Sequence, residues 1–211
     1  MSIAEMKTKV KMCGMMRPED IAAANECKPD FIGFIFAENR KRTVSADAAA
    51  AMRAALDKEI KAVGVFLDQD VHFVADTAKT CNLDYIQLHG SEDENYICSL
   101  KELTDIPIIK AFVVKDESTI EKANASKAEM ILLDSGAGSG ETFGWQILRD
   151  IKREYFLAGG LSPENAGEAI DTLHPYALDV SSGIETNGCK DPAKMKKFMQ
   201  EVLDRYKEET P

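Results

Sequence analysis

The sequence lacks an apolar run long enough to cross a bilayer, which argues against a membrane protein and against membrane partners. Its first eleven residues are polar or charged where a signal peptide would have an apolar core, so we expect a cytoplasmic protein. The five cysteines form no Cys-x-x-Cys pair and no cluster with histidine, which argues against a zinc site and a disulfide framework. We therefore expect reduced thiols and no bound metal.

An excess of positive charge is also absent, because 36 acidic residues outnumber 26 basic ones and the formal net charge at pH 7 is −10. This balance disfavours nucleic acid as a partner, and local amides and a few cations must hold any anionic ligand. A content of 45% hydrophobic and 29% charged residues is typical of a globular protein, and 211 residues suit one domain spanning 1–211. No strand edge or apolar stripe predicts an interface, so the sequence is compatible with a monomer.

What the chain does contain is a repeated alternation of a short apolar run and a longer amphipathic run. The apolar runs predict eight strands, which end at Cys13 or cover 31–36, 62–67, 85–88, 108–113, 130–133, 155–158 and 177–180. The segments that follow them predict helices at 18–27, 46–56, 70–80, 91–103, 117–125, from about 145, from about 162, and at 191–206.

Eight apolar strands that are each followed by a helix predict an α/β fold, a single (β/α)8 TIM barrel with a closed parallel eight-stranded sheet. An open doubly wound sheet is the alternative. No Gly-x-Gly-x-x-Gly motif follows the first strand, and polar residues recur at nearly every strand's carboxyl end rather than at one switch point. These features favour the barrel, in which the strand ends meet at one mouth and carry the chemistry.

Cys13 ends the first strand and shares one face of it with Lys11. A buried cysteine taken alone is more often an inert packing residue than a reactive one. Its place before Gly14, at a strand-to-helix junction, favours a reactive thiol, because helix N-terminal amides would stabilise a thiolate that serves as base or nucleophile. Lys11 either holds that thiolate by its charge or pairs with an acid inside the barrel, and both roles stay open.

Polar residues at later strand ends are further candidates. Asp134 closes an apolar strand, where it either caps the following loop or, with a pKa raised by desolvation, acts as a general acid that faces Cys13. Arg42 is either a solvated cation or a planar clamp for a substrate carboxylate. His89 is either a satisfied core-edge histidine or a neutral hydrogen-bond donor to substrate. Asp179 lies near the end of the eighth strand.

Turns of small residues follow the last two strands. Gly159-Gly160 and Ser181-Ser182-Gly183 occupy the positions where barrels often hold phosphate with backbone N–H groups. Glycine lets the backbone approach a ligand closely, although a Gly-Gly pair also suits any tight strand-to-helix turn. Two such turns after consecutive strands predict a phosphate site on this side of the mouth.

Eight short motifs, in this order and at these strand ends, resemble the phosphoribosylanthranilate isomerase family of tryptophan biosynthesis. They are KMCG (11–14), FIGFIF (31–36), RTVS (42–45), VGVF (63–66), IQLHG (86–90), LLDS (132–135), AGGLSPEN (158–165) and DVSSGIE (179–185). The resemblance extends from about residue 9 to the last predicted helix.

The resemblance implies a cofactor-free Amadori rearrangement of a small phosphosugar. In that reaction N-(5-phosphoribosyl)anthranilate becomes 1-(2-carboxyphenylamino)-1-deoxyribulose 5-phosphate. The resemblance implies that Asp134 is the general acid and Cys13 the general base. It also places the anthranilate carboxylate at Arg42, the phosphate at the two small-residue turns, and a polar position of the pocket at Asp179.

Two loops depart from the family pattern. The loop after Asp134 is short, with Glu141 where lysine is common and Gly144 where aspartate is common, which bears on closure over the mouth. The pair Arg40-Lys41 stands before Arg42, where Ser-Pro or Ser-Lys is often found.

Two other functions compete with the isomerase. One is a dual-specificity barrel that also rearranges the aminoimidazole ribotide of histidine biosynthesis, and the other is a barrel that binds a phosphorylated ligand without turnover. Cys13 argues against the first, because such bifunctional barrels use an aspartate there. The joint presence of Cys13 and Asp134 argues against the second.

Overall fold

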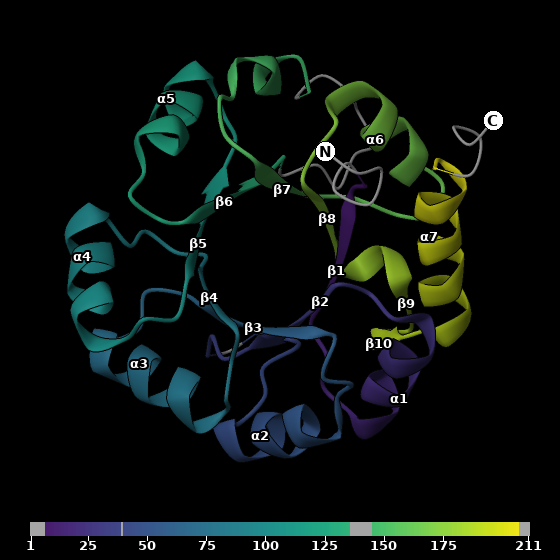
Figure 1. The fold of residues 1–211 in the computed structure, drawn as a ribbon, viewed down its shortest axis with the longest axis horizontal. Helices are drawn as coiled ribbons and strands as arrows, with labels where there is room; N and C mark the ends of the chain where they lie inside the picture. Colours follow the sequence, from purple (N-terminus) through teal and green to yellow (C-terminus); the bar gives the residue numbers. More distant parts are fainter. Residues whose placement is uncertain (1–6, 39, 136–144, 207–211) are drawn as a thin grey trace.

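A closed barrel of eight parallel strands forms the centre of the computed structural model, which describes residues 7–38, 40–135 and 145–206 (Figure 1). The strands are β1 (Lys9–Cys13), β2 (Phe31–Ile35), β3 (Lys61–Phe66), β4 (Tyr85–Leu88), β5 (Ile108–Val113), β6 (Met130–Asp134), β7 (Tyr155–Ala158) and β8 (Ala177–Val180). The predicted TIM barrel is confirmed. The open doubly wound alternative is wrong, because β1 pairs with β8 as well as with β2 and so closes the sheet.

Helices surround this barrel (Figure 1). The α-helices are α1 (Pro18–Cys27), α2 (Ala46–Ala55), α3 (Val71–Thr80), α4 (Glu94–Leu103), α5 (Glu117–Ala125), α6 (Ala166–Leu173) and α7 (Pro192–Asp204). Two short 3-10 helices, η3 (Ile147–Asp150) and η4 (Ser182–Ile184), and a hairpin of β9 (Glu185–Thr186) and β10 (Cys189–Lys190) complete the described elements.

Local sequence explains where several helices begin. Ser45 caps α2, since its side chain accepts a hydrogen bond from the backbone N–H of Ala48 at 3.2 Å. Pro18 lies in the first turn of α1, where its missing N–H costs nothing. Asp191 caps α7 directly before Pro192. These starts agree with the sequence prediction to within a residue.

The helix predicted from about residue 145 is wrong, because the described chain there forms only the four-residue η3. Tertiary hydrogen bonds explain the difference. The side chain of Asn124, at the end of α5, donates to the carbonyl of Asp150 at 3.1 Å. The guanidinium of Arg153 donates to the carbonyl of Ser126 at 2.7 Å. The chain is therefore tied to α5 and enters β7 before a longer helix forms.

The last third of the chain differs in two smaller ways. Helix α6 begins at Ala166 rather than near Ser162, because residues 163–165 form a turn. The hairpin of β9 and β10 lies between η4 and α7 and has no counterpart in the prediction. Strands of two residues are too short to show a periodic pattern.

Side chains alternate between the two faces of the barrel wall. On β1, Val10 and Met12 belong to the large hydrophobic core that packs the strands against the helices. Lys11 and Cys13 face the other way, into the barrel, where a second cluster that includes Phe31 fills the interior. The polar face predicted for β1 is therefore the inner face of the barrel.

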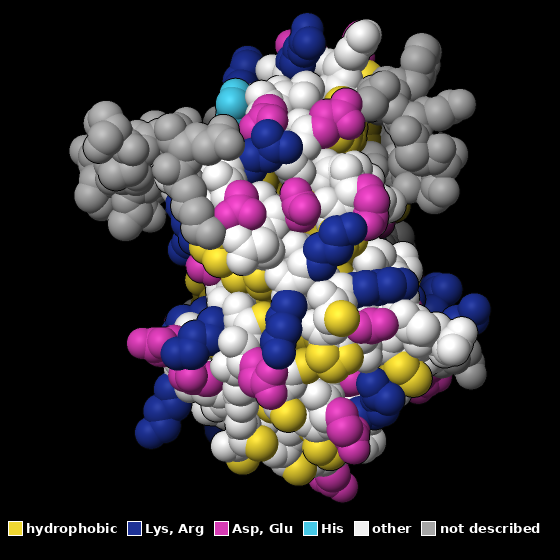
Figure 2. Space-filling view, turned by 90° about the vertical axis from the view of Figure 1, so that its right-hand side faces the viewer, with side chains coloured by type: hydrophobic (Ala, Val, Ile, Leu, Met, Phe, Trp, Pro, Cys, Tyr) yellow, Lys and Arg dark blue, Asp and Glu magenta, His cyan; other side chains and the backbone are white. Residues whose placement is uncertain are grey.

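Charges of both signs are interspersed on the face that carries α7 (Figure 2). Several form exposed ion pairs, such as Lys196 with Glu26 at 2.7 Å and Lys197 with Glu164 at 2.8 Å. Exposed pairs of this kind each contribute about 1 kcal/mol or less to stability. Within residues 7–38, 40–135 and 145–206, no helix combines the length and apolarity needed to span a membrane.

Candidate active site

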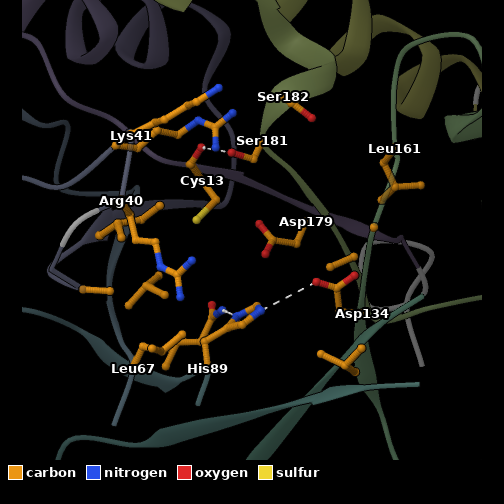
Figure 3. Close-up of a pocket in the computed structure, with 18 of the residues that line it drawn as sticks. Cys13, Arg40, Lys41, Leu67, His89, Asp134, Leu161, Asp179, Ser181 and Ser182 are labelled. Atoms are coloured by element: carbon orange, nitrogen blue, oxygen red, sulfur yellow. Dashed lines mark hydrogen bonds and ion pairs between the residues drawn. The ribbon is translucent and has the colours of Figure 1, made fainter. Parts of the chain in front are cut away.

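A cavity of about 650 Å³ opens at the carboxyl ends of the barrel strands (Figure 3). Its polar side chains come from several strands and loops and are Cys13, Arg40, Lys41, Arg42, Gln87, His89, Asp134, Asp179, Ser181 and Ser182. Gly159 and Gly160 also line it. The structure thus brings together all the predicted site residues except Gly183.

Gly183 lies behind the cavity lining, in η4, where it packs against the connection between β7 and α6. A Cβ atom at this position would lie 2.0 Å from the carbonyl oxygen of Leu161. Glycine is therefore required here for close packing of η4.

Lys11 and Asp179 form an ion pair inside the barrel, between the neighbouring strands β1 and β8. Nζ of Lys11 donates to both carboxylate oxygens of Asp179 at 2.9 Å. The Lys11 side chain is fully buried, and that of Asp179 is 7% exposed. Burial by itself lowers the pKa of Lys11, but the negative charge of Asp179 reverses this, so the pKa is raised above its ordinary value. One of the two predicted roles of Lys11, pairing with an acid, is confirmed.

The thiol of Cys13 is buried beside this pair. Burial raises its pKa above the ordinary value, and the charge of Lys11 opposes that rise. The predicted stabilisation by helix amides is wrong, because α1 begins only at Pro18. The two amides that follow Cys13 both donate to the carbonyl of Gly33 instead. The positive charge of Lys11, and after it that of Lys190, therefore favours a thiolate here.

Asp134 enters the cavity from the end of β6, and Figure 3 shows Asp179 between it and Cys13. Nε2 of His89 lies 3.6 Å from Oδ2 of Asp134, and these side chains are 27% and 25% exposed. Nε2 of Gln87 lies 2.7 Å from Nδ1 of His89. The Gln87 amide nitrogen can donate to Nδ1, and in that tautomer of His89 the ring N–H is on Nε2, on the side of Asp134.

Gly159 and Gly160 turn the chain directly beside Asp134. Their φ angles are +98° and +65°, a region that disfavours other residues. A Cβ atom on Gly159 would also lie 2.7 Å from Oδ1 of Asp134. The pair is therefore required both by the tight turn and by the close approach to the carboxylate.

Arg42 forms an ion pair that the sequence does not predict. Its Nε and Nη2 donate to the two carboxylate oxygens of Glu185 at 2.6 and 2.7 Å. Nζ of Lys190 donates to the same carboxylate at 2.6 Å. Glu185 belongs to one of the motifs quoted above, but neither it nor Lys190 ends a predicted strand. No sequence signal therefore connects these two residues to the mouth.

The loop residues that depart from the family pattern fall in two places. The guanidinium of Arg40 points into the cavity toward His89 in Figure 3. Glu141 and Gly144 lie in the segment 136–144, outside the described residues.

The arrangement joins a buried thiol beside a lysine, a carboxyl group beside a histidine, two glycine- or serine-rich turns and two arginines. Such a set can bind an anionic substrate and move protons between a thiol and a carboxylate. In the part of the chain that the structure describes, no group of three or more histidine, cysteine, aspartate or glutamate side chains could hold a metal ion.

Comparison with known proteins gives a consistent result. A sequence model of the family described as N-(5′-phosphoribosyl)anthranilate (PRA) isomerase matches residues 10–201. N-(5′-phosphoribosyl)anthranilate isomerase from Thermoanaerobacter sp. (strain X514) is 43% identical over 201 residues, which cover 92% of this chain and 97% of the relative.

Solved structures are similar over the same extent. The phosphoribosyl anthranilate isomerase from Thermotoga maritima superposes with a TM-score of 0.85 at 35% identity, covering 93% of this chain and 99% of the other. A structure of phosphoribosyl anthranilate isomerase in complex with reduced 1-(o-carboxyphenylamino)-1-deoxyribulose 5-phosphate has a TM-score of 0.81 at 32% identity, with the same coverage.

Proposed function

The chain belongs to the N-(5′-phosphoribosyl)anthranilate isomerase family of tryptophan biosynthesis, and we propose that Asp134 and Cys13 are the acid and base of its reaction. The reaction is the Amadori rearrangement of N-(5-phosphoribosyl)anthranilate to 1-(2-carboxyphenylamino)-1-deoxyribulose 5-phosphate. The observation that carries the proposal is that Asp134 from β6 and Cys13 from β1, strands that are not neighbours in the barrel, line one cavity. A substrate held between them meets both groups.

The cavity offers a partner for each charged part of this substrate. The turns at Gly159-Gly160 and Ser181-Ser182 line one side, where backbone N–H groups can hold the phosphate. Arg42 is the proposed partner of the anthranilate carboxylate. The reduced carboxyphenylamino deoxyribulose phosphate bound by a relative carries the same two anionic groups.

Asp134 acts first. Its protonated carboxyl donates a proton to the ring oxygen of the ribose, the bond from that oxygen to C1′ breaks, and the anilino nitrogen lone pair forms the Schiff base. The N–H of His89, 3.6 Å from the carboxyl oxygen, stabilises the carboxylate that is left. We assign His89 this supporting role because one ring nitrogen faces the carboxyl group of Asp134 and Gln87 holds the other.

Cys13 acts second. Its thiolate takes the proton from C2′, the electrons of that bond move toward the iminium nitrogen, and the resulting enolamine tautomerises to the ketone product. Burial raises the thiol pKa, which makes the thiolate a stronger base, and the charge of Lys11 keeps it attainable. Lys11 in turn is held by Asp179, which is thereby placed at the floor of the cavity.

The test is Asp134→Asn, assayed by the loss of phosphoribosylanthranilate fluorescence. An amide keeps the shape of the side chain but cannot deliver a proton, so we expect kcat to fall roughly 10²- to 10⁴-fold while the reduced product analogue still binds. Asp171→Asn, which changes an exposed carboxylate paired with Arg205, is the matched control and should behave as the unmodified protein. Near-normal turnover by the Asp134 variant would contradict the assignment.

The same assay separates the competing functions. Turnover of phosphoribosylanthranilate but not of the aminoimidazole ribotide supports the single-substrate isomerase. Turnover of both supports the dual-specificity barrel. Tight binding of the product analogue by the unmodified protein without turnover supports a binding function.

A further inference from the structure

The side chain of Arg42 is held at two points, one on its aliphatic stem and one on its guanidinium. Its aliphatic stem crosses Gly14, where a Cβ atom would lie 2.5 Å from Cδ of Arg42. One edge of the guanidinium, formed by Nε and Nη2, is occupied by the Glu185 carboxylate at 2.6 and 2.7 Å. The two contacts come from the turn after β1 and from the hairpin after β8, and these two strands are neighbours in the barrel.

Glu185 is suited to this task because it is rigid and buried. Its side chain is 7% exposed, and that of Lys190 is 1% exposed. The two residues are directly paired in the β9–β10 hairpin. Nζ of Lys190 also donates to the carbonyl of Ser181 at 3.0 Å, and Oγ of Ser181 donates to the carbonyl of Cys13 at 3.0 Å. The carboxylate that holds Arg42 is thus anchored to the floor of the cavity.

The charges of this cluster leave one positive charge for a ligand. Hydrogen bonds from Arg42 and Lys190 hold the pKa of Glu185 below its ordinary value despite its burial. Burial lowers the pKa of Lys190, and its hydrogen bond to Glu185 opposes that fall. Lys190 offsets the charge of Glu185, so pairing with Glu185 does not neutralise Arg42. The second edge of the guanidinium, Nη1 with the other hydrogen of Nη2, makes no hydrogen bond to any residue in the described ranges.

We propose that Glu185 is a positioning residue that acts through Arg42: it holds the Nε edge so that the Nη1–Nη2 edge is presented to the substrate carboxylate. The inference rests on the proposed function, since it assumes that Arg42 receives that carboxylate. A guanidinium already fixed in place binds more tightly, because less side-chain freedom is lost on binding. A planar, two-pronged edge also selects a carboxylate over an uncharged substituent.

The experiment measures the affinity of two ligands for four proteins. The ligands are reduced 1-(o-carboxyphenylamino)-1-deoxyribulose 5-phosphate and its phenylamino counterpart, which lacks the carboxyl group. The proteins are the unmodified chain, Glu185→Gln, Arg42→Ala and the double variant. Glutamine keeps the length of the side chain but turns an N–H₂ group toward a guanidinium nitrogen, so it cannot hold the edge.

We expect Glu185→Gln to weaken the carboxylated ligand on the order of ten- to a hundredfold and the phenylamino ligand less than about threefold. In turnover, KM should rise by a similar factor while kcat stays within about twofold. Added to Arg42→Ala, the Glu185 change should have little further effect, because its partner is already gone. Glu185→Asp, which keeps the charge, should restore part of the affinity.

Three controls are needed to interpret the affinities of the Glu185 variants. Glu164→Gln removes the same charge from an exposed pair with Lys197 and should leave both affinities unchanged. Thermal unfolding shows which variants fold, and Glu185→Asp serves in place of the glutamine variant if that one does not. Failure of the proposed function would appear as no turnover by the unmodified protein, whereas the ratio of the two affinities tests the positioning role separately.

Three results would overturn the proposal. Equal weakening of both ligands would show a general structural role. Full additivity with Arg42→Ala would show that Glu185 does not act through Arg42. Tighter binding of the carboxylated ligand by Glu185→Gln would show that Glu185 competes with the substrate for the guanidinium.

Discussion

Replacing Lys11 by methionine should destabilise the protein strongly, because it leaves the carboxylate of Asp179 without its partner. Lys11 is fully buried and contacts both oxygens of Asp179, whose side chain is 7% exposed. Breaking a buried ion pair by removing one partner costs about 3–5 kcal/mol. For a chain of this length about 1 kcal/mol corresponds to about 2–4 °C in Tm, so the expected loss is roughly 6–20 °C.

The measurement is urea-induced unfolding followed by far-ultraviolet circular dichroism, with thermal unfolding in parallel. The double variant Lys11→Met with Asp179→Leu should recover most of the stability, since replacing both members of a buried pair with apolar groups is often neutral. Lys197→Met, which breaks the exposed pair with Glu164, is the matched control and should cost about 1 kcal/mol or less.

Activity should separate from stability in these variants. The positive charge of Lys11 lowers the pKa of Cys13, so both the single and the double variant should be slow even where the double variant is stable. A loss of about 1 kcal/mol or less for Lys11→Met would refute the reasoning, because such a value is typical of a solvated pair. A double variant as unstable as the single one would also refute it.

Three further predictions concern Cys13 and Arg42. Cys13→Ser should lower kcat by several orders of magnitude, roughly 10³-fold or more. The reason is that an alcohol is a far weaker acid than a thiol and is not ionised here. A loss of less than about tenfold would exclude the thiolate as base. The thiolate of Cys13 can be followed as the difference in ultraviolet absorbance between the protein and Cys13→Ser. Its midpoint should lie above pH 9, because burial raises the pKa from 9.0, and a midpoint near neutral pH would contradict this. A thiol whose pKa is higher in the folded than in the unfolded protein adds to stability while it is protonated in both states. The contribution of Cys13 to stability is therefore complete below pH 9 and is lost as the pH rises through the folded-state pKa. Arg42→Ala should raise KM on the order of ten- to a hundredfold through loss of the carboxylate contact, and an effect on kcat alone would count against that contact.

Much of the architecture could be predicted because it depends on local patterns. Continuous apolar runs of four to six residues mark buried parallel strands, and Ser45 and Asp191 mark helix starts that the structure confirms. The alternation on β1 placed Lys11 and Cys13 on one face, which is the inner face of the barrel. The helix expected from about residue 145 failed because hydrogen bonds tie this segment to the end of α5, from Asn124 to Asp150 and from Arg153 to Ser126, and end it early.

Some residues of the candidate site could likewise be predicted from the sequence, and others could not. Residues that end a strand, such as Cys13 and Asp134, could be found from the sequence because the carboxyl ends of all barrel strands meet at one mouth. The sequence left two roles open for Lys11, and it did not reveal that the amides after Cys13 bond to Gly33 rather than face the thiol. Glu185 could not be found either, since it follows a short 3-10 helix rather than a strand.

The sequence by itself determined the order of the eight barrel strands and of most helices between them, and which side chains share a face, because these follow from periods of two and 3.6 residues. Only the tertiary structure decided which charged groups meet. Lys11 and Asp179 are 168 residues apart along the chain, and Arg42 and Glu185 are 143 apart. Such pairs arise when β8 closes the barrel against β1, and no local pattern records a contact that exists only after closure.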